Sequence, residues 1–187
     1  MSDGGPSTRT ILRALGFGFA LLVLGAWLAR SFFPAESPLM SQPAPPLEGR
    51  IVAGEGADRE DRVSLESLRG RPVILDFWAS WCPPCRASIP ILSRLAATHA
   101  DAGLVTLGVN VEANQTRSFV ERAHRALRSG FPTLHDEHYR MQADYGVESL
   151  PTLVLIDRRG VVRRVEVGVP DETDLDAQIR ELLAENP

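Results

Sequence analysis

The stretch PVILDFWASWCPPCRASIP, residues 72–90, contains the only two cysteines of the 187-residue chain. Its first seven residues form a nearly continuous apolar run, which is typical of a central strand that is covered on both faces. After the two prolines that separate Cys82 from Cys85, apolar residues recur at helical spacing over residues 84–100. The stretch therefore predicts a buried strand that leads into a helix, with both sulfurs at the junction and one carboxylate, Asp76, inside the strand.

The pattern from residue 50 onward alternates short strands with helices. Pro90 is expected to kink the first helix, because proline removes a backbone hydrogen bond. The whole order predicts an α/β fold, a central sheet with strands in mixed directions that is flanked by helices. The other predicted elements are a hairpin over residues 50–53 and 62–65, a buried strand over 104–111, a helix over 116–128, a hairpin over 152–157 and 161–167, and a helix over 173–185.

The bulk composition is ordinary for one folded domain with additional segments, since 44% of the residues are hydrophobic and 24% are charged. The net charge is −4 and no long run of either sign is present, so nothing indicates a nucleic-acid-binding surface. Two cysteines allow one disulfide at most, and their C-x-x-C spacing indicates redox chemistry or metal binding.

The first 33 residues differ from the rest of the chain. Residues 14–29 carry no charge, and as a helix they would span about 24 Å, somewhat less than a bilayer interior of about 30 Å. Snorkelling of Arg13 and Arg30 can supply the difference. We therefore expect residues 1–33 to be a cytoplasmic N-terminus followed by a transmembrane signal anchor, with a cleaved signal peptide or a buried helix as alternatives.

A proline-rich segment separates this anchor from the folded domain. Residues 34–49 contain five prolines, which favour an extended spacer, and residues 50–187 are expected to form the domain. Basic residues mark the cytoplasmic side of a membrane span, and here they favour the N-terminal side. The domain is therefore expected outside the cytoplasm.

The cysteine pair can exchange with a client disulfide if one sulfur attacks and the other releases the mixed disulfide. The N-terminus of a helix favours a thiolate, so we assign Cys82 as the exposed attacking sulfur and Cys85, one turn further in, as the shielded resolving sulfur. A permanent disulfide and a zinc site are the alternatives. Zinc needs about four ligands, and the other candidates are His99, His124, His135 and His138.

The two prolines between the cysteines indicate the direction of the reaction. Pro83 and Pro84 have no backbone N–H group, so chiefly the Cys85 amide remains to stabilise a Cys82 thiolate. A less stabilised thiolate means a less stabilised reduced form, which makes the pair a better reductant.

Asp76 is a carboxylate in a strand that offers little access to water. Such a group is costly to bury unless it protonates, so we expect its pKa to be raised. Our hypothesis is that Asp76 accepts the proton of Cys85 when Cys85 attacks the mixed disulfide. The alternative is an aspartate at the strand end that accepts a hydrogen bond from a backbone amide.

These motifs resemble a known family. Residues from about 47 to 183 resemble the thioredoxin-like fold of the membrane-anchored TlpA/ResA-like group, which is related to CcmG/DsbE. The segments that carry the resemblance are RVSLESLRGRPVILDFWASWCPPCRASIP, LGVNVEANQTRSFVERA and FPTLHDEHYRMQADYGVESLPTLVLIDRRGVV. The resemblance implies an N-terminal β-hairpin, an extra helical insertion between the second and third strands, and an exposed connection around His135 and His138.

The resemblance also implies roles for single residues. Pro151 is expected to be cis and to lie against the dithiol, where the backbone of Leu150 pairs with an extended client. From its place beside Cys82, Trp81 is expected in an apolar platform around the sulfur and Trp78 in the core, with plain core packing of both tryptophans as the alternative. The expected client-contacting residues are Trp81, Pro83, Pro84, Leu150 and Pro151.

Two acidic positions bear on the site. Plain thioredoxins have Asp at the position of Asp76, whereas ResA-like proteins often have Asn there and a Glu at the helix position that Ser88 occupies here. The proton-handling role is therefore expected on Asp76. A client specificity that depends on the helix Glu is not expected to carry over to this chain. Glu112 follows a strand at the same end of the sheet, and we expect a solvated loop acid there, with modulation of the site as the alternative.

The sequence thus predicts an extracytoplasmic thiol–disulfide oxidoreductase that acts mainly as a reductase, with no cofactor beyond the Cys82–Cys85 disulfide. The resemblance implies a monomer anchored in the inner membrane with its domain in the periplasm, apocytochrome c as the client during cytochrome c maturation, and a membrane thiol transporter of the DsbD/CcdA type as the electron donor. Copper-site assembly proteins of cytochrome oxidase are alternative clients. The alternative functions are a disulfide-introducing oxidase and a redox-inactive binding or metal-carrier module.

Overall fold

The computed structural model describes residues 18, 20–25, 37–57 and 61–185, and it divides the chain into two units, Met1–Ser37 and Pro38–Pro187. In the first unit residues 18 and 20–25 are helical, and Ser37 is not. The transmembrane anchor was predicted over residues 1–33, and most of these residues lie outside the described ones. Within the described part, no helix combines the length and the apolar character that a membrane crossing requires.

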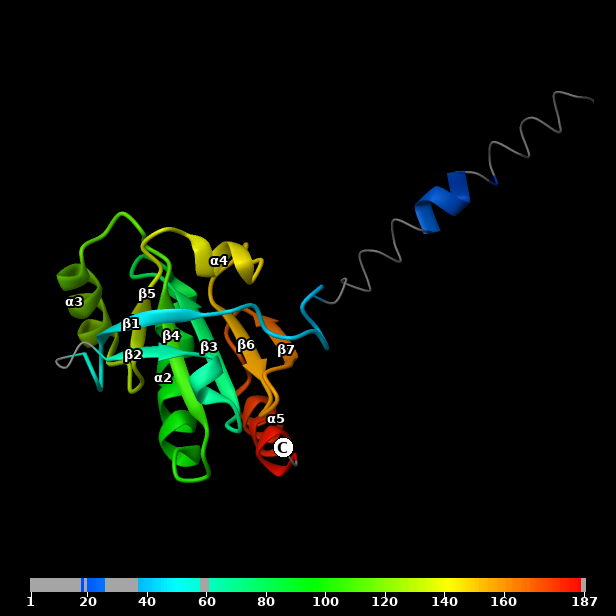
Figure 1. The fold of residues 1–187 in the computed structure, drawn as a ribbon. Helices are drawn as coiled ribbons and strands as arrows, with labels where there is room; N and C mark the ends of the chain where they lie inside the picture. Colours follow the sequence, from blue (N-terminus) through cyan, green and yellow to red (C-terminus); the bar gives the residue numbers. More distant parts are fainter. Residues whose placement is uncertain (1–17, 19, 26–36, 58–60, 186–187) are drawn as a thin grey trace, which may run out of the picture. The chain divides into compact units, whose positions relative to one another are not determined.

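The second unit is built around one seven-stranded sheet with the strand order β2-β1-β5-β4-β3-β6-β7 (Figure 1). Strands β3 and β4 are parallel, as are β4 and β5, whereas the other neighbours are antiparallel. This confirms the predicted α/β fold with mixed strand directions. The strands are β1 (Glu48–Ala53), β2 (Arg62–Ser64), β3 (Val73–Trp78), β4 (Val105–Asn110), β5 (Thr133–His135), β6 (Thr152–Ile156) and β7 (Val162–Val167).

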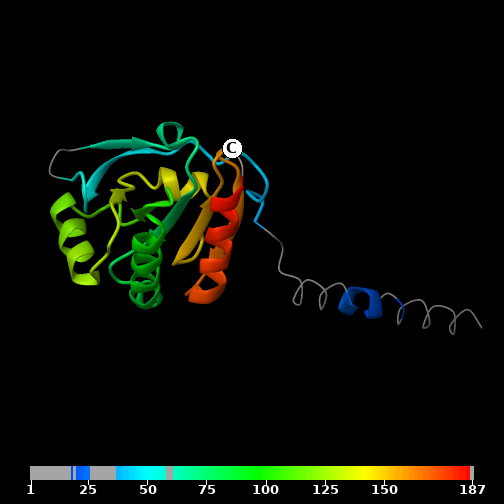
Figure 2. The same cartoon turned by 90° about the horizontal axis from the view of Figure 1, so that it is seen from below.

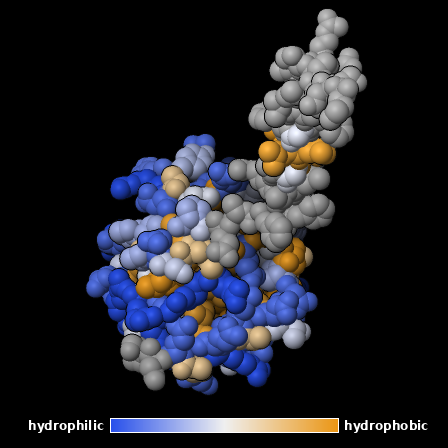
Figure 3. All heavy atoms as spheres, turned by 90° about the vertical axis from the view of Figure 1, so that its right-hand side faces the viewer, coloured by the Kyte–Doolittle hydropathy of each residue, from blue (hydrophilic) through white to orange (hydrophobic). Residues whose placement is uncertain are grey.

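Helices cover both faces of this sheet. Figure 2 shows α2, α3 and α5 along one side of the sheet, with the short α4 on the other. The face of the domain seen in Figure 3 is mostly hydrophilic with small separate apolar patches, as expected where the sheet and its helices enclose the core. The helices are α2 (Pro83–His99), α3 (Arg117–Leu127), α4 (Arg140–Asp144), α5 (Glu172–Ala184) and the 3-10 turn η1 (Glu66–Leu68).

The central strand β3 positions the cysteines. All six of its residues are buried, because β4 and β6 flank it and helices cover it. The helix α2 begins almost directly after this strand, with Cys82 as its N-cap and prolines in its first turn, where their missing N–H groups cost no helical bond. Pro90 lies inside α2 on its exposed side, and α2 continues through it, so the predicted kink stays a prediction.

Two elements between β4 and β6 were not predicted. Strand β5 pairs with both β1 and β4, and α4 follows it. The expectation of an exposed connection is therefore wrong for His135, which ends β5 and is 8% exposed. The three-residue strand is too short to give a recognisable periodicity, and its place in the sheet comes from pairing with β1 and β4.

The proline-rich spacer is shorter than expected. Residues 38–49, which we assigned to it, are part of the second unit. The Ser41 amide donates to the Val162 carbonyl at 2.8 Å, the Tyr145 hydroxyl donates to the Pro45 carbonyl at 2.7 Å, and Leu47 is 2% exposed. The burial of Leu47 and these hydrogen bonds hold the segment on the domain. Residues from Pro38 onward are therefore part of the domain and not of a spacer.

Candidate active site

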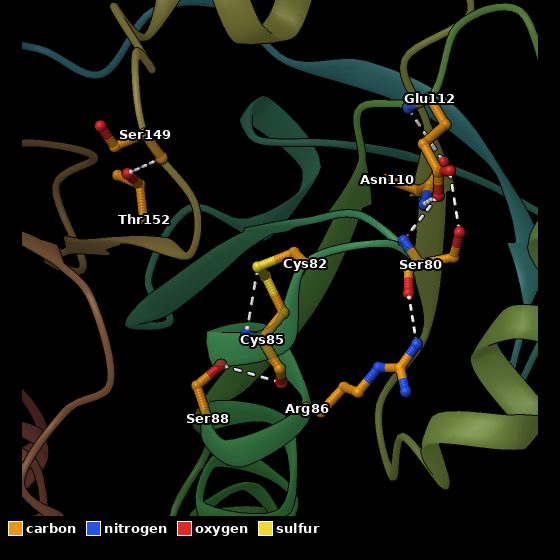
Figure 4. Close-up of a disulfide and its surroundings, with 9 residues drawn as sticks. All are labelled: Ser80, Cys82, Cys85, Arg86, Ser88, Asn110, Glu112, Ser149 and Thr152. Atoms are coloured by element: carbon orange, nitrogen blue, oxygen red, sulfur yellow. Dashed lines mark hydrogen bonds between the residues drawn. A yellow bond between two sulfur atoms is a disulfide. The ribbon is translucent and has the colours of Figure 1, made fainter.

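The two sulfurs form a disulfide at the junction of β3 and α2 (Figure 4). The Cys85 amide donates a hydrogen bond to Cys82 Sγ over 3.1 Å, in the manner of a helix N-cap. In the described part of the chain no other donor bonds to Cys82 Sγ. The expected loss of donors at Pro83 and Pro84 is therefore present in the structure.

The exposure of the two sulfurs differs from expectation in one respect. Cys85 is 0% exposed and thus shielded, as predicted, but Cys82 is only 2% exposed rather than open to solvent. Cys82 nevertheless lines a surface groove, whereas Cys85 does not. The neighbouring side chains that wall this groove cover most of the Cys82 residue, so a client must enter the groove to reach its sulfur.

The groove has a volume of about 680 Å³ and combines apolar and acidic walls. Trp81 and Tyr139 are the large exposed side chains in it, with 65% and 48% of their surface accessible. Among the described residues that line it there are two carboxylates, Glu112 and Glu148, and no arginine or histidine. Its other lining residues are Cys82, Pro83, Pro84, Val111, Asn114, Gln115, Gln142, Ser149 and Leu150.

The segment before β6 forms another wall of this groove. The peptide bond between Leu150 and Pro151 is cis, as predicted. Thr152 Oγ1 donates to the Ser149 carbonyl over 2.7 Å, and Gly168 N donates to the Pro151 carbonyl over 2.9 Å. These bonds fix the turn, and Figure 4 shows Ser149 and Thr152 on the far side of the disulfide from Glu112.

Asp76 lies in the middle of β3 and is 0% exposed. Neither of its carboxylate oxygens has a hydrogen-bond partner among the described residues, and burial raises its pKa from 3.8 to about 7. Its neighbours across the sheet are Gly108 on β4 and Leu153 on β6, whose side chains offer neither a donor nor a cation. The alternative of a strand-end aspartate bonded to an amide is therefore wrong, and the expected rise in pKa is confirmed.

The helix position that carries Glu in ResA-like proteins is also buried here. Ser88 is 0% exposed, and its hydroxyl donates to the Cys85 carbonyl over 3.2 Å. It therefore presents no charge to the cysteines. Of the two tryptophans, Trp78 is 0% exposed and belongs to the core as predicted, while Trp81 stands at the groove.

Glu112 is not the solvated loop acid that the sequence led us to expect. It is 9% exposed and accepts hydrogen bonds from the Ser80 amide at 2.7 Å, the Ser80 hydroxyl at 2.9 Å and Asn110 Nδ2 at 3.0 Å. It lines the same groove as Cys82. The donor loop lies 32 residues away in the sequence, so only the parallel pairing of β3 with β4 brings the groups together.

The histidines proposed as alternative metal ligands each have another contact or an exposed position. His124 Nε2 bonds to the Phe131 carbonyl, His135 Nε2 to the Glu112 carbonyl, and His99 Nε2 to Asp176. His138 is exposed. Within the described ranges, no group of three or more His, Cys, Asp or Glu side chains is arranged to hold a metal ion.

Comparison with known proteins places this site in a family. A family model described as the AhpC/TSA family matches residues 40–165, well over half of the chain. The chain belongs to the AhpC/TSA family. Because its relatives include thiol–disulfide oxidoreductases and it carries a disulfide-forming cysteine pair on a thioredoxin-like fold, this AhpC/TSA protein is a thiol–disulfide oxidoreductase, and its redox group is its own disulfide.

Individual relatives of this AhpC/TSA protein agree with that assignment. It is 28% identical over 174 residues to the thiol-disulfide oxidoreductase ResA of Geobacillus thermodenitrificans, covering 93% of this chain and 96% of ResA. It is 30% identical over 151 residues to the thiol:disulfide interchange protein DsbE of Pseudomonas aeruginosa, covering 81% and 78% of the two chains. A crystal structure of a thiol:disulfide interchange protein from Chlorobium tepidum matches with a TM-score of 0.63 at 30% identity, covering 76% of this chain and 96% of that one.

Proposed function

We propose that this oxidoreductase reduces disulfides of client proteins outside the cytoplasm, with Cys82 as the attacking sulfur and Cys85 as the resolving sulfur. The observation that carries the reducing direction is the single backbone donor at Cys82 Sγ, the Cys85 amide. Helix amides stabilise a thiolate, and a reduced form with fewer of them gives up its electrons more readily.

The proposed reaction begins with the reduced protein. The Cys82 thiolate attacks one sulfur of the client disulfide, forming a mixed disulfide and releasing the other client sulfur as a thiolate. The Cys85 thiol then loses its proton and attacks Cys82 Sγ, which releases the second client sulfur. Two electrons have passed to the client, and the Cys82–Cys85 disulfide must be reduced again by an external dithiol.

Asp76 is the proposed acceptor of the Cys85 proton. Its pKa of about 7 leaves it divided between the two protonation states near neutral pH, which suits a group that must take up and return a proton. The carboxylate has no competing hydrogen bond to give up when it does so.

The groove is the proposed client site. Its exposed apolar side chain, Trp81, stands next to Cys82, and Leu150 offers its backbone from the opposite segment. An extended client chain can then pair with the backbone and place its cysteine over Cys82. The proposed contacts are Trp81, Pro83, Pro84, Leu150 and Pro151.

The resemblance to the TlpA/ResA-like group supports the cellular assignment. We propose an N-terminal membrane anchor with the domain in the periplasm, a monomeric protein, apocytochrome c as the client, and a DsbD/CcdA-type transporter as the electron donor. The Cys85→Ser variant of the full chain should accumulate the mixed disulfide through Cys82, and the Cys82→Ser/Cys85→Ser variant is its control. Recovery of apocytochrome c supports the assignment, whereas recovery of copper-site assembly proteins or of no client contradicts it.

The reducing direction is tested by restoring a donor. Pro84 is the second residue of α2, a position whose amide can reach an N-cap side chain, whereas the first position, Pro83, is less well placed. Pro84→Ala should therefore raise the reduction potential, and Pro83→Ala is the matched control with a smaller effect. The wild-type potential, measured against glutathione, should lie near that of thioredoxin, about −270 mV, and a value near about −120 mV would contradict the proposal.

A further inference from the structure

The carboxylate of Glu112 fixes the loop that leads to the attacking cysteine. Glu112 follows β4, and its Oε2 and Oε1 accept hydrogen bonds from the amide and the hydroxyl of Ser80 at 2.7 and 2.9 Å. Ser80 lies two residues before Cys82. Figure 4 shows this cluster beside the disulfide, with Glu112 and Asn110 facing Ser80.

Glu112 is in turn held by the sheet behind it. Asn110, which ends β4 and is 0% exposed, donates from Nδ2 to the carboxylate at 3.0 Å and accepts from the Glu112 amide at 3.1 Å. His135 at the end of β5 donates from Nε2 to the Glu112 carbonyl at 3.0 Å. The position of the negative charge is therefore set by two strands and not by a mobile side chain.

Among the described residues, no cation forms a contact with the carboxylate of Glu112. Its three donors are two N–H groups and a hydroxyl, all uncharged, and in the described part of the chain it forms no ion pair. Other charged groups lie at the groove and the loop: Glu148 lines the groove, and Arg86 donates to the Ser80 carbonyl at 3.3 Å. Both are exposed and thus screened by water, whereas Glu112 is 9% exposed and is screened less.

We propose that Glu112 is a positioning residue of the dithiol, which holds the Ser80 loop and disfavours the Cys82 thiolate through its negative charge. The inference rests on the proposed function in one respect, the assignment of Cys82 as the attacking sulfur. Reduction of the disulfide consumes two electrons and two protons and gives two thiols, of which Cys82 then loses its proton to become the thiolate. A nearby negative charge opposes that loss, so the reduced state gains less stabilisation and the dithiol donates electrons more readily.

Two variants separate the charge from the clamp. Glu112→Gln removes the charge and keeps one acceptor oxygen for Ser80, while Ser80→Ala keeps the charge and removes one of the hydrogen bonds. The equilibrium constant with glutathione and the ultraviolet absorbance of the Cys82 thiolate across pH are measured for each purified full chain. Circular dichroism shows whether each variant is folded.

Glu112→Gln should shift the glutathione equilibrium towards the reduced protein by about three- to tenfold and should lower the pKa of Cys82. Ser80→Ala should change the glutathione equilibrium constant and the acid dissociation constant of Cys82 each by less than about twofold, because the charge remains. An unchanged Glu112→Gln variant overturns the proposal, and so do equal shifts in the two variants, which would mean that loop geometry alone acts. If Glu112→Gln does not fold, Glu112→Asp keeps the charge with a shorter reach, and a pKa of Cys82 that departs from the wild-type value in it overturns the proposal.

The outcome is independent of the reaction direction. The wild-type potential tests whether the protein is a reductase, whereas the difference between the wild type and Glu112→Gln tests the role of Glu112. A wild-type potential as high as that of an oxidase would therefore remove the proposed direction and still leave the effect of Glu112 measurable.

Discussion

Asp76 lies in the middle of β3 and Glu112 follows the neighbouring strand β4, yet the two carboxylates have different hydrogen-bond environments. Within the part of the chain that the structure describes, Asp76 inside β3 has no hydrogen-bond partner for either oxygen, and burial raises its pKa to about 7. Glu112, just after β4, is nearly as buried but accepts three hydrogen bonds. Burial without donors favours the protonated form of a carboxylate, whereas hydrogen bonds to a carboxylate hold its neighbours in place.

The comparison explains why two acids are useful at one dithiol. In the proposed reaction the proton of Cys85 needs an acceptor, and we propose Asp76 for it because its carboxylate forms no hydrogen bond with the described residues. The loop before Cys82 needs a fixed anchor, and Glu112 provides it through Ser80. The difference lies in the donors that each carboxylate finds, and it can be tested through stability as well as through activity.

The largest expected effect is on the pH dependence of stability. The pKa of Asp76 is raised from 3.8 to about 7 in the folded oxidised protein, so between these values the folded state holds more protons than the unfolded state. The free energy of unfolding should therefore fall as the pH rises through this window, by about 4 kcal/mol in total from this group. Chemical denaturation of the wild type and of Asp76→Asn across pH measures it, and the variant should lack this component. Parallel curves for the two proteins would show that Asp76 ionises normally.

Removal of the Glu112 side chain should lower the free energy of unfolding, whereas removal of the Asp76 charge should raise it above neutral pH, and the effect at Glu112 should be smaller. Glu112→Ala leaves the Ser80 amide, the Ser80 hydroxyl and Asn110 Nδ2 without their acceptor, which should reduce the free energy of unfolding by about 1–3 kcal/mol. Urea denaturation above neutral pH measures this loss of stability. At that pH, Asp76→Asn should instead be more stable than the wild type. Equal stability of Glu112→Ala and the wild type would show that these contacts hold nothing in place.

Much of the fold could be predicted from local patterns. The apolar run of β3, the helical spacing of α2 and the two hairpins depend on neighbouring residues in the sequence, and each was found close to its predicted range. Strand β5 could not be predicted, because three residues carry no periodicity and pairing with β1 and β4 is what stabilises them. The packing of residues 38–47 on the domain was missed for the same reason, since proline content describes the local backbone and not its distant contacts.

The site residues also divide into those that local sequence predicts and those that depend on distant contacts. The burial of Asp76 was predicted from a lone acid in an apolar run, and the cis bond before Pro151 from the resemblance that the motif LPT carries. The burial of Glu112 was not, because its donors come from Ser80, 32 residues away. A serine just before the cysteine motif and an acid just after the next parallel strand form the signal that could have been used. The low exposure of Cys82 was also missed, since it depends on how the groove walls meet.

The proposal that Asp76 accepts the Cys85 proton is tested most directly by the rate of mixed-disulfide resolution in single turnover as a function of pH. For the wild type, the rate should rise as the pH passes through about 7, because Asp76 must be ionised to act as the base. Asp76→Asn should lack this inflection and be slower by up to about 100-fold near neutral pH. A variant that resolves the mixed disulfide as fast as the wild type at every pH would contradict the account.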